Sequence, residues 1–175
     1  MTRLKGPDLK LFTPIAIKQV TLPNRVVIAP MCQYSAHDGL FADWHFANYS
    51  KYALGRPGAI ILEASAVQDI GRITHGDLGI WSDTHADAMR GIVEFIKGQG
   101  VVPGIQIGHA GRKASIQRPW HGNGALDETD AARGETAWQV IGPSPLPAGK
   151  GWLVPREMTR ADIAQVTADF VAAAR

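Results

Sequence analysis

The sequence predicts an α/β fold in which parallel strands alternate with helices. Continuous apolar runs rich in β-branched residues begin near Arg25, Ala59 and Val101. Segments with helical periodicity separate these runs, and another follows the third run after a long loop. Strands that are buried on both faces and joined through helices pair in parallel, with right-handed crossovers. The pattern therefore indicates either a doubly wound sheet or a (β/α)8 barrel.

The first strand is expected over 25–31, RVVIAPM, where Pro30 ends the apolar run. Before it, the segment 10–24 is expected to form a short hairpin that caps the amino-terminal mouth of the fold. The segment 43–55 predicts a helix with Asp43 as its N-cap and Gly55 as its stop. The apolar residues on one side of this helix are Trp44, Ala47, Tyr52 and Leu54.

A second buried strand is expected over 59–67, AIILEASAV. Glu63 lies inside this apolar run, so its carboxyl group needs a buried partner. Arg25 and Lys113 are both candidates, and the sequence does not decide between them.

The next helix is expected over 82–100, with Ser82 or Asp83 as its cap and glycine at its end. The third strand follows at 101–109. A last helix opens at Thr159 and continues to the end of the sequence. The apolar positions of the two helices are Met89, Ile92, Val93 and Ile96 in the first, and Ile163, Val166, Phe170 and Val171 in the second.

The segment 110–158 is rich in Gly, Pro and Trp and has no periodicity. Long loops without regular structure are typical of lids and binding loops. Trp120, Trp138 and Trp152 either pack this loop against the fold or shape an entrance to a site.

Composition limits the function classes. A chain of 175 residues that is 45% hydrophobic is long and apolar enough for one core. The formal net charge of +2 and the lack of a basic block give no reason to expect nucleic acid. The single cysteine excludes an internal disulfide and a zinc site of several thiolates. No apolar run reaches about 18 residues, so we expect a cytoplasmic protein with no membrane partner.

The barrel is favoured over the doubly wound sheet because no G-x-G-x-x-G fingerprint follows the first strand. A (β/α)8 barrel typically needs about 250 residues. The chain is therefore expected to hold about the first three βα units, with 1–175 as the amino-terminal half of a single domain.

Chemically distinctive residues stand at the carboxyl ends of the three strands, where parallel α/β folds place their sites. These are Cys32 with Tyr34, then Ala64, then Gln106. A thiol, an amide and a small residue suit the binding of a flat heterocycle, and neither a Ser-His-Asp arrangement nor a metal-ligand cluster accompanies them. The alternative is that Cys32 is a packing residue and that Gln106 satisfies a neighbouring backbone group.

The motifs P-M-C-x-Y (30–34), E-A-S-A (63–66) and Q-x-x-H-A-G-R-K (106–113) resemble those of the Old Yellow Enzyme family. The resemblance runs from Leu11 to Arg175 and is greatest to the bacterial xenobiotic reductases and thermostable ene-reductases. It implies an FMN-binding TIM barrel. It also implies that His109 and Arg112 support the flavin pocket and transfer no proton.

The resemblance implies a role for each site residue. Cys32 and Tyr34 would act in catalysis, Cys32 by tuning the flavin and Tyr34 by reaching the carbonyl of the substrate. No metal would be needed. The residues that would bind FMN are Ala29, Pro30, Met31, Cys32, Ala64 and Gln106.

The implied function is that of an NAD(P)H-dependent ene-reductase, an oxidoreductase that reduces the activated C=C bond of an enone or a related electron-poor alkene. The chain alone is expected to be inactive, with the carboxyl-terminal half of the barrel as its missing partner and a homo-oligomer as the intact form. Two alternatives remain open: a flavin-free TIM-barrel enzyme, and a non-catalytic half-barrel that pairs with itself or a partner.

Overall fold

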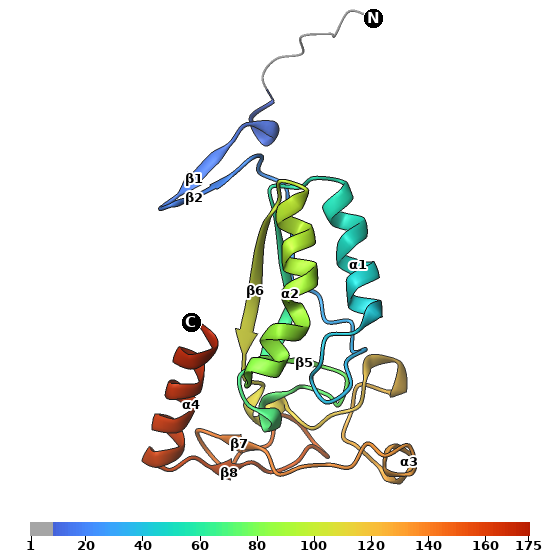
Figure 1. Cartoon of the computed structure of the whole chain (residues 1–175). Coiled ribbons are helices and arrows are strands. Elements are labelled where there is room, and N and C mark those ends of the chain that lie inside the picture. Colours follow the sequence, from blue (N-terminus) through green and yellow to red (C-terminus); the bar gives the residue numbers. More distant parts are fainter. Residues whose placement is uncertain (1–8) are drawn as a thin grey trace, which may run out of the picture.

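A computed structural model of the chain describes residues 9–175. The expected domain also includes residues 1–8, which lie outside the described residues. At the centre is a parallel sheet of β3 (Val27–Ile28), β4 (Ala59–Ala66), β5 (Leu78–Gly79) and β6 (Val102–Gly108) (Figure 1). Each of the other three strands pairs in parallel with β4. The predicted order of parallel strands and crossover helices is confirmed.

The first strand is shorter than expected. The predicted strand 25–31 forms ladder pairs only at Val27 and Ile28. Beyond them the chain continues as an irregular segment, because Pro30 has no N–H to donate. The N–H of Gln33 is directed at the side chain of Glu63, at 2.9 Å, instead of at a neighbouring strand.

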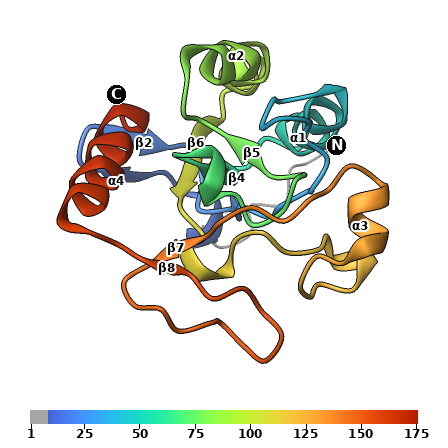
Figure 2. The same ribbon diagram turned by 90° about the horizontal axis from the view of Figure 1, so that it is seen from below.

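Two helices pack side by side on one face of the sheet: α1 (Asp43–Leu54) and α2 (Asp83–Gly98) (Figure 2). Ser82 is the N-cap of α2, as expected. The core lies between these helices and β4, where burial of apolar side chains supplies the main stabilisation. Its aliphatic members include Ile60, Leu62, Leu78, Met89, Ile92 and Ile96.

The sequence was misleading about α1. Its N-cap is Ala42, and Asp43 is already helical, because the ring of His45 accepts the N–H of Ala42 at 3.1 Å. The expected apolar face is also wrong, since Trp44, Ala47, Tyr52 and Leu54 are exposed. The helix instead turns a partly polar face inward, formed by His45, Asn48, Tyr49 and Ala53.

The predicted amino-terminal hairpin is present. After the short helix η1 (Lys10–Phe12), β1 (Ile15–Ile17) and β2 (Val20–Leu22) pair antiparallel. The hairpin lies beyond the amino-terminal ends of the sheet strands (Figure 1). The role of this hairpin in closing the mouth of a barrel stays a prediction.

The connections contain short elements. Between β4 and β5 lies η2 (Asp69–Gly71). The long segment after β6 is not wholly irregular, because β7 (Ile141–Gly142) and β8 (Arg156–Glu157) form a parallel pair. Its other elements are η3 (Gly111–Lys113), η4 (Pro119–His121) and α3 (Glu128–Ala132).

Thr159 caps the last helix, α4 (Arg160–Ala173), by accepting the N–H of Asp162 at 3.1 Å, as expected. None of the residues of α4 is fully buried, so its apolar stripe is only partly covered. Within residues 9–175, no helix is both long and apolar enough to cross a membrane.

The core predicts a clear contrast between two isoleucines. Ile92 on α2 has no exposed surface, whereas Ile163 on α4 is 52% exposed. We expect Ile92→Ala to lower the free energy of unfolding by about 3 kcal/mol, because it leaves a cavity. The control Ile163→Ala is expected to cost less than about 1 kcal/mol. Urea unfolding of both variants tests this, and equal losses would contradict the described packing.

Candidate functional site

A cavity of about 330 Å³ opens at the carboxyl ends of β4 and β6. Cys32, Ala64 and Gln106 all line it, so the structure brings together one residue from each of the three predicted clusters. The convergence follows from parallel pairing, which places the carboxyl ends of neighbouring strands at the same edge. The other lining residues are Ser65, Ala66, Gly71, Ile73, Asp77, Ile107, Gly108, His109 and Ala110.

Three predicted cofactor-binding residues do not line this cavity. Ala29, Pro30 and Met31 precede Cys32 on the irregular segment after β3, and the side chain of Met31 is 71% exposed. Their roles in binding a cofactor stay predictions.

Tyr34 lies beside the cavity in a constrained backbone conformation. Its φ of 52° is in the left-handed region, which is costly for a residue with a Cβ and is common at functional sites. Arg118 donates to the carbonyl oxygen of Tyr34 at 2.6 Å. A Cβ on Gly76 would lie only 2.2 Å from that oxygen, so this position requires glycine.

The long loop after β6 reaches the same place. The ring of Trp120 meets the ring of Tyr34 edge-on, with centroids 6.0 Å apart, and is 59% exposed. Trp138, in contrast, donates its indole N–H to the carbonyl of Ile70 at 3.0 Å and packs the loop down. Packing is therefore confirmed for Trp138, whereas an entrance role for Trp120 stays a prediction.

The thiol of Cys32 is half-buried and neutral. Burial raises its pKa to about 11, and the negative charges of Asp77 and Glu63 act in the same direction. A thiol in this state is a poor nucleophile near neutral pH but a usable hydrogen-bond donor. Burial likewise raises the pKa of the Tyr34 hydroxyl, which therefore keeps its proton.

Gln106 presents its amide at the exposed rim of the cavity. Among the described residues, no hydrogen-bond partner engages this side chain. Small residues form much of the neighbouring wall, including Ala64, Ala66 and Gly108. A free amide beside a wall of small residues fits the edge and the face of a flat, polar ring such as the flavin of FMN.

His109 is held as a neutral ring. Its Nδ1 accepts the N–H of Gly111 at 3.0 Å, so the proton lies on Nε2, which faces the Gln68 oxygen at 3.0 Å. Burial lowers the pKa of His109. Gln68 in turn donates to Asp169 on α4 at 2.5 Å. This geometry agrees with the predicted supporting role, which stays a prediction. Arg112 does not line the cavity.

Asp77 is a cavity residue that the sequence analysis missed. It is almost fully buried and accepts the N–H of Ile73 at 2.8 Å and the hydroxyl of Thr74 at 2.9 Å. Burial raises its pKa. The spacing T-H-G-D at 74–77 was the available signal, because a threonine hydroxyl three residues before an aspartate often closes a turn.

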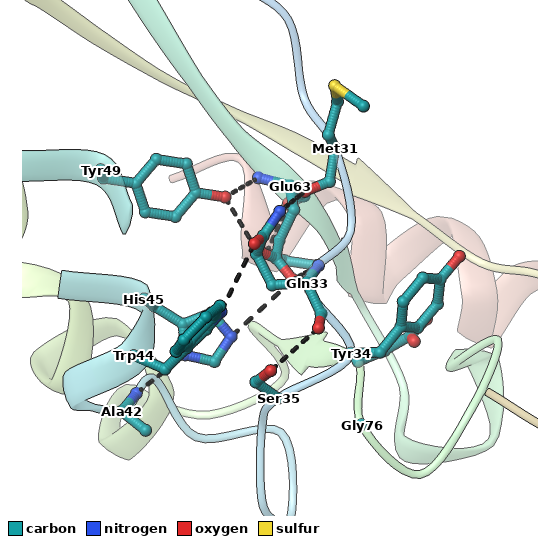
Figure 3. Close-up of polar contacts among 12 residues, drawn as sticks. Met31, Gln33, Tyr34, Ser35, Ala42, Trp44, His45, Tyr49, Glu63 and Gly76 are labelled. Atoms are coloured by element: carbon teal, nitrogen blue, oxygen red, sulfur yellow. Dashed lines mark hydrogen bonds and ion pairs between the residues drawn. The ribbon is translucent and has the colours of Figure 1, made fainter. Parts of the chain in front are cut away.

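Glu63 has partners that the sequence did not suggest. Its carboxylate accepts the N–H of Gln33 at 2.9 Å and the hydroxyl of Tyr49 at 2.8 Å (Figure 3). Neither Arg25 nor Lys113 contacts it. Arg25 instead bonds Thr13 and the carbonyl of Pro14. Burial raises the pKa of Glu63 to about 7.

Glu63 faces α1 rather than the cavity because the strand register shifts within β4. Leu62 pairs with Ile105 and Ser65 with Ile107, so β4 has one extra residue between these pairs. Such a bulge interrupts the alternation of side chains. Glu63 therefore faces α1, while Ala64 lines the cavity.

A separate cluster of possible metal ligands lies in the long loop. Ligand atoms of His121, Asp130 and Glu135 lie within 4.8 Å of one another. Both carboxylates are already paired, Glu135 with Arg118 at 2.7 Å and Asp130 with Arg133. These cations neutralise the charge that would attract a metal ion.

Residues 10–175 match the NADH:flavin oxidoreductase / NADH oxidase family. The chain is 41% identical over 169 residues to a NADH:flavin oxidoreductase from Gibberella zeae, which covers 95% of this chain and 40% of that protein. It is 54% identical over 110 residues to an NADPH dehydrogenase from Bacillus subtilis. This match covers 62% of this chain and 32% of that protein.

Among solved structures, an Old Yellow Enzyme from Pichia superposes with a TM-score of 0.75 at 25% identity, covering 95% of this chain and 42% of that one. The fold is therefore that of the first part of the (β/α)8 barrel found in these neighbours, as expected. The chain spans 32–44% of the length of these curated relatives.

The titration of Glu63 predicts a pH-dependent stability difference. Its pKa rises from 4.5 to about 7 on folding, so the unfolded state loses its proton first. The contribution of Glu63 to the free energy of unfolding therefore falls as pH rises from 4.5 to about 7, and it is constant below and above this range. Glu63→Gln cannot titrate. We expect the stability of the wild type relative to this variant to fall by roughly 3 kcal/mol between pH 4 and pH 8. Urea unfolding at both pH values measures it, and parallel pH profiles would contradict the prediction.

Proposed function

Because the chain belongs to the NADH:flavin oxidoreductase / NADH oxidase family, we propose that its cavity is part of the FMN site of an NAD(P)H-dependent ene-reductase. The observation that carries this proposal is the convergence of Cys32, Ala64 and Gln106 at one edge of the parallel sheet. A neutral thiol, an approachable backbone and a free amide are the groups needed to hold a flavin ring.

Each of these residues has a defined task. Gln106 would hydrogen-bond the polar edge of the ring, and Ala64 would let the strand backbone approach it closely. The thiol of Cys32 would donate a hydrogen bond without adding charge, since its raised pKa keeps it protonated. Bound FMN would supply the hydride chemistry, with NAD(P)H as the reductant. The protein supplies orientation and the electrostatic environment.

Tyr34 would orient the substrate. Its hydroxyl keeps a proton and its ring stands beside Trp120, so the pair offers one hydrogen-bond donor and an aromatic wall. An α,β-unsaturated carbonyl compound matches both features, because its oxygen accepts a hydrogen bond and its conjugated system is flat. We therefore propose an enone or a similarly electron-poor alkene as the substrate.

The proposed activity belongs to a complete barrel. The matched relatives are more than twice as long as this chain, so we propose that residues of the remaining barrel complete the FMN and substrate sites. In this view residues 1–175 are one part of a single domain that acts as a homo-oligomer in the cytoplasm, where NAD(P)H is supplied.

Visible absorption after incubation with FMN and desalting tests the site directly. A retained and shifted flavin spectrum is the expected result for a protein that carries the whole barrel. For the chain alone, retention would mean that these residues hold FMN without the rest of the barrel. A colourless complete barrel would overturn the proposed function.

The amide of Gln106 provides a sharper test. We expect Gln106→Ala to raise the Kd for FMN about five-fold, which corresponds to the loss of one net hydrogen bond of about 1 kcal/mol. Gln99→Ala, at the C-cap of α2 and outside the cavity, is the matched control and should leave the Kd unchanged. Quenching of flavin fluorescence in a titration measures both. Equal affinities would remove Gln106 from the site.

A further inference from the structure

The network around Glu63 has no part in the proposed function. Glu63 has no exposed surface and directly precedes the cavity residue Ala64 on β4. Its side chain points away from the cavity, toward Tyr49 and His45 of α1 and toward the backbone of Gln33 (Figure 3). It therefore joins the strand, the helix and the segment that carries Cys32 and Tyr34.

The protons of this network are directed at the carboxyl group. The oxygen of Tyr49 accepts the backbone N–H of Glu63 at 2.8 Å, so the single proton of Tyr49 goes to the Glu63 Oε2 atom at 2.8 Å. The other carboxyl oxygen accepts the N–H of Gln33. A carboxylate accepts both bonds, whereas a carboxylic acid would bring a further proton to a place already supplied with donors.

His45 points a further N–H toward Glu63 without forming a hydrogen bond. Its Nδ1 accepts the N–H of Ala42 at 3.1 Å, which places the ring proton on Nε2. That atom is fully buried, has no hydrogen-bond partner, and lies 3.8 Å from Oε1 of Glu63. Burial lowers the pKa of His45 to about 4, so the ring is neutral and offers a dipole in place of a charge.

The connection to Cys32 is short. The peptide N–H that Glu63 binds belongs to Gln33, which lies between Cys32 and Tyr34 in the chain. The side chain of Gln33 fixes the same segment a second time, by donating to the carbonyl of Met31 at 2.8 Å. Glu63 thus anchors the backbone of the segment that carries Cys32, through the hydrogen bond from the Gln33 N–H.

We propose that Glu63 is an anionic positioning residue, which anchors the Cys32–Tyr34 segment through the Gln33 N–H and places a negative charge behind the Cys32 thiol. The consequence for FMN rests on the proposed function, because the neutral thiol would face the flavin. The effect on Cys32 itself does not depend on any cofactor.

The other ionisable groups around Glu63 are few. Tyr49 and His45 face it from α1, and Cys32 and Tyr34 lie on the anchored segment. Asp77 is the second anion that acts on Cys32, and Arg72 partly offsets its charge. An experiment must therefore distinguish the effect of Glu63 on the Cys32 thiol from the effect of Asp77.

Alkylation of Cys32 by iodoacetamide measures the effect in the 175-residue chain without FMN. Cys32 is the only cysteine, so the rate reports on one thiol. With Glu63→Gln, we expect the rate at pH 9 to rise about three-fold, which corresponds to about half a pKa unit. Asp77→Asn is expected to raise it as well. Glu94→Gln, on the exposed face of α2, makes the same change in net charge and should have no effect.

The variant Tyr49→Phe distinguishes the effect of the Glu63 charge from the effect of loosening the hydrogen-bond network. It removes one hydrogen bond of the network but leaves the carboxylate, which is ionised at pH 9. We expect the alkylation rate of this variant to match the wild type. An unchanged rate in Glu63→Gln, or an equal rise in both variants, would overturn the proposal, since the second result indicates mere loosening of the segment.

The wild type supplies a measurement that needs no variant. The ¹³C shifts of the Glu63 carboxyl and of the Cys32 Cβ should change together near neutral pH, where the charge of Glu63 changes. A Cys32 signal that stays flat through the Glu63 titration would overturn the proposal even if Glu63→Gln failed to fold. Adding FMN to the same samples tests the proposed function separately, because either result can occur without the other.

Discussion

The pairing of β4 with its neighbours determines where every residue of the candidate site lies. At its start Ala59 pairs with Val27 on one side and with Val102 on the other. At its end Ser65 pairs with Leu78 and Ile107. Because all these pairings are parallel, the strands finish at one edge of the sheet, and residues far apart in the chain meet around one cavity. A slip of one residue along β4 would move Ala64 off that cavity.

The extra residue in β4 gives this strand two functions. Leu62 packs in the core beneath α1 and α2, and the next residue, Glu63, also faces α1. Strict alternation would send one of the two toward the cavity. The bulge allows consecutive residues to serve the helix side, and it returns Ala64 to the cavity side. A carboxyl group thereby comes to lie just behind the site without entering it.

The sequence was informative where one physical rule decides the outcome. Apolar runs and helical periodicity were sufficient for the order of strands and helices, and parallel pairing was sufficient to bring Cys32, Ala64 and Gln106 together. It failed where local geometry decides. Periodicity assigned Trp44 to the buried face of α1, but the helix instead turns His45 and Tyr49 inward, and Tyr49 donates to Glu63. The partner of Glu63 depends on a bulge, and a bulge has no reliable signature in a single sequence.

Anchoring a loop through a buried carboxyl group costs desolvation free energy. Desolvation opposes its charge and raises its pKa, so holding the ionised form costs stability above neutral pH. The structure nevertheless gives Glu63 donors from α1 and from the segment after β3, and a buried His45 N–H points toward it at 3.8 Å without a hydrogen bond. Groups arranged at such a cost concentrate where position and charge matter more than stability. For this fold that place is the thiol-bearing edge of the cavity, and Glu63 is the residue that connects it to the core.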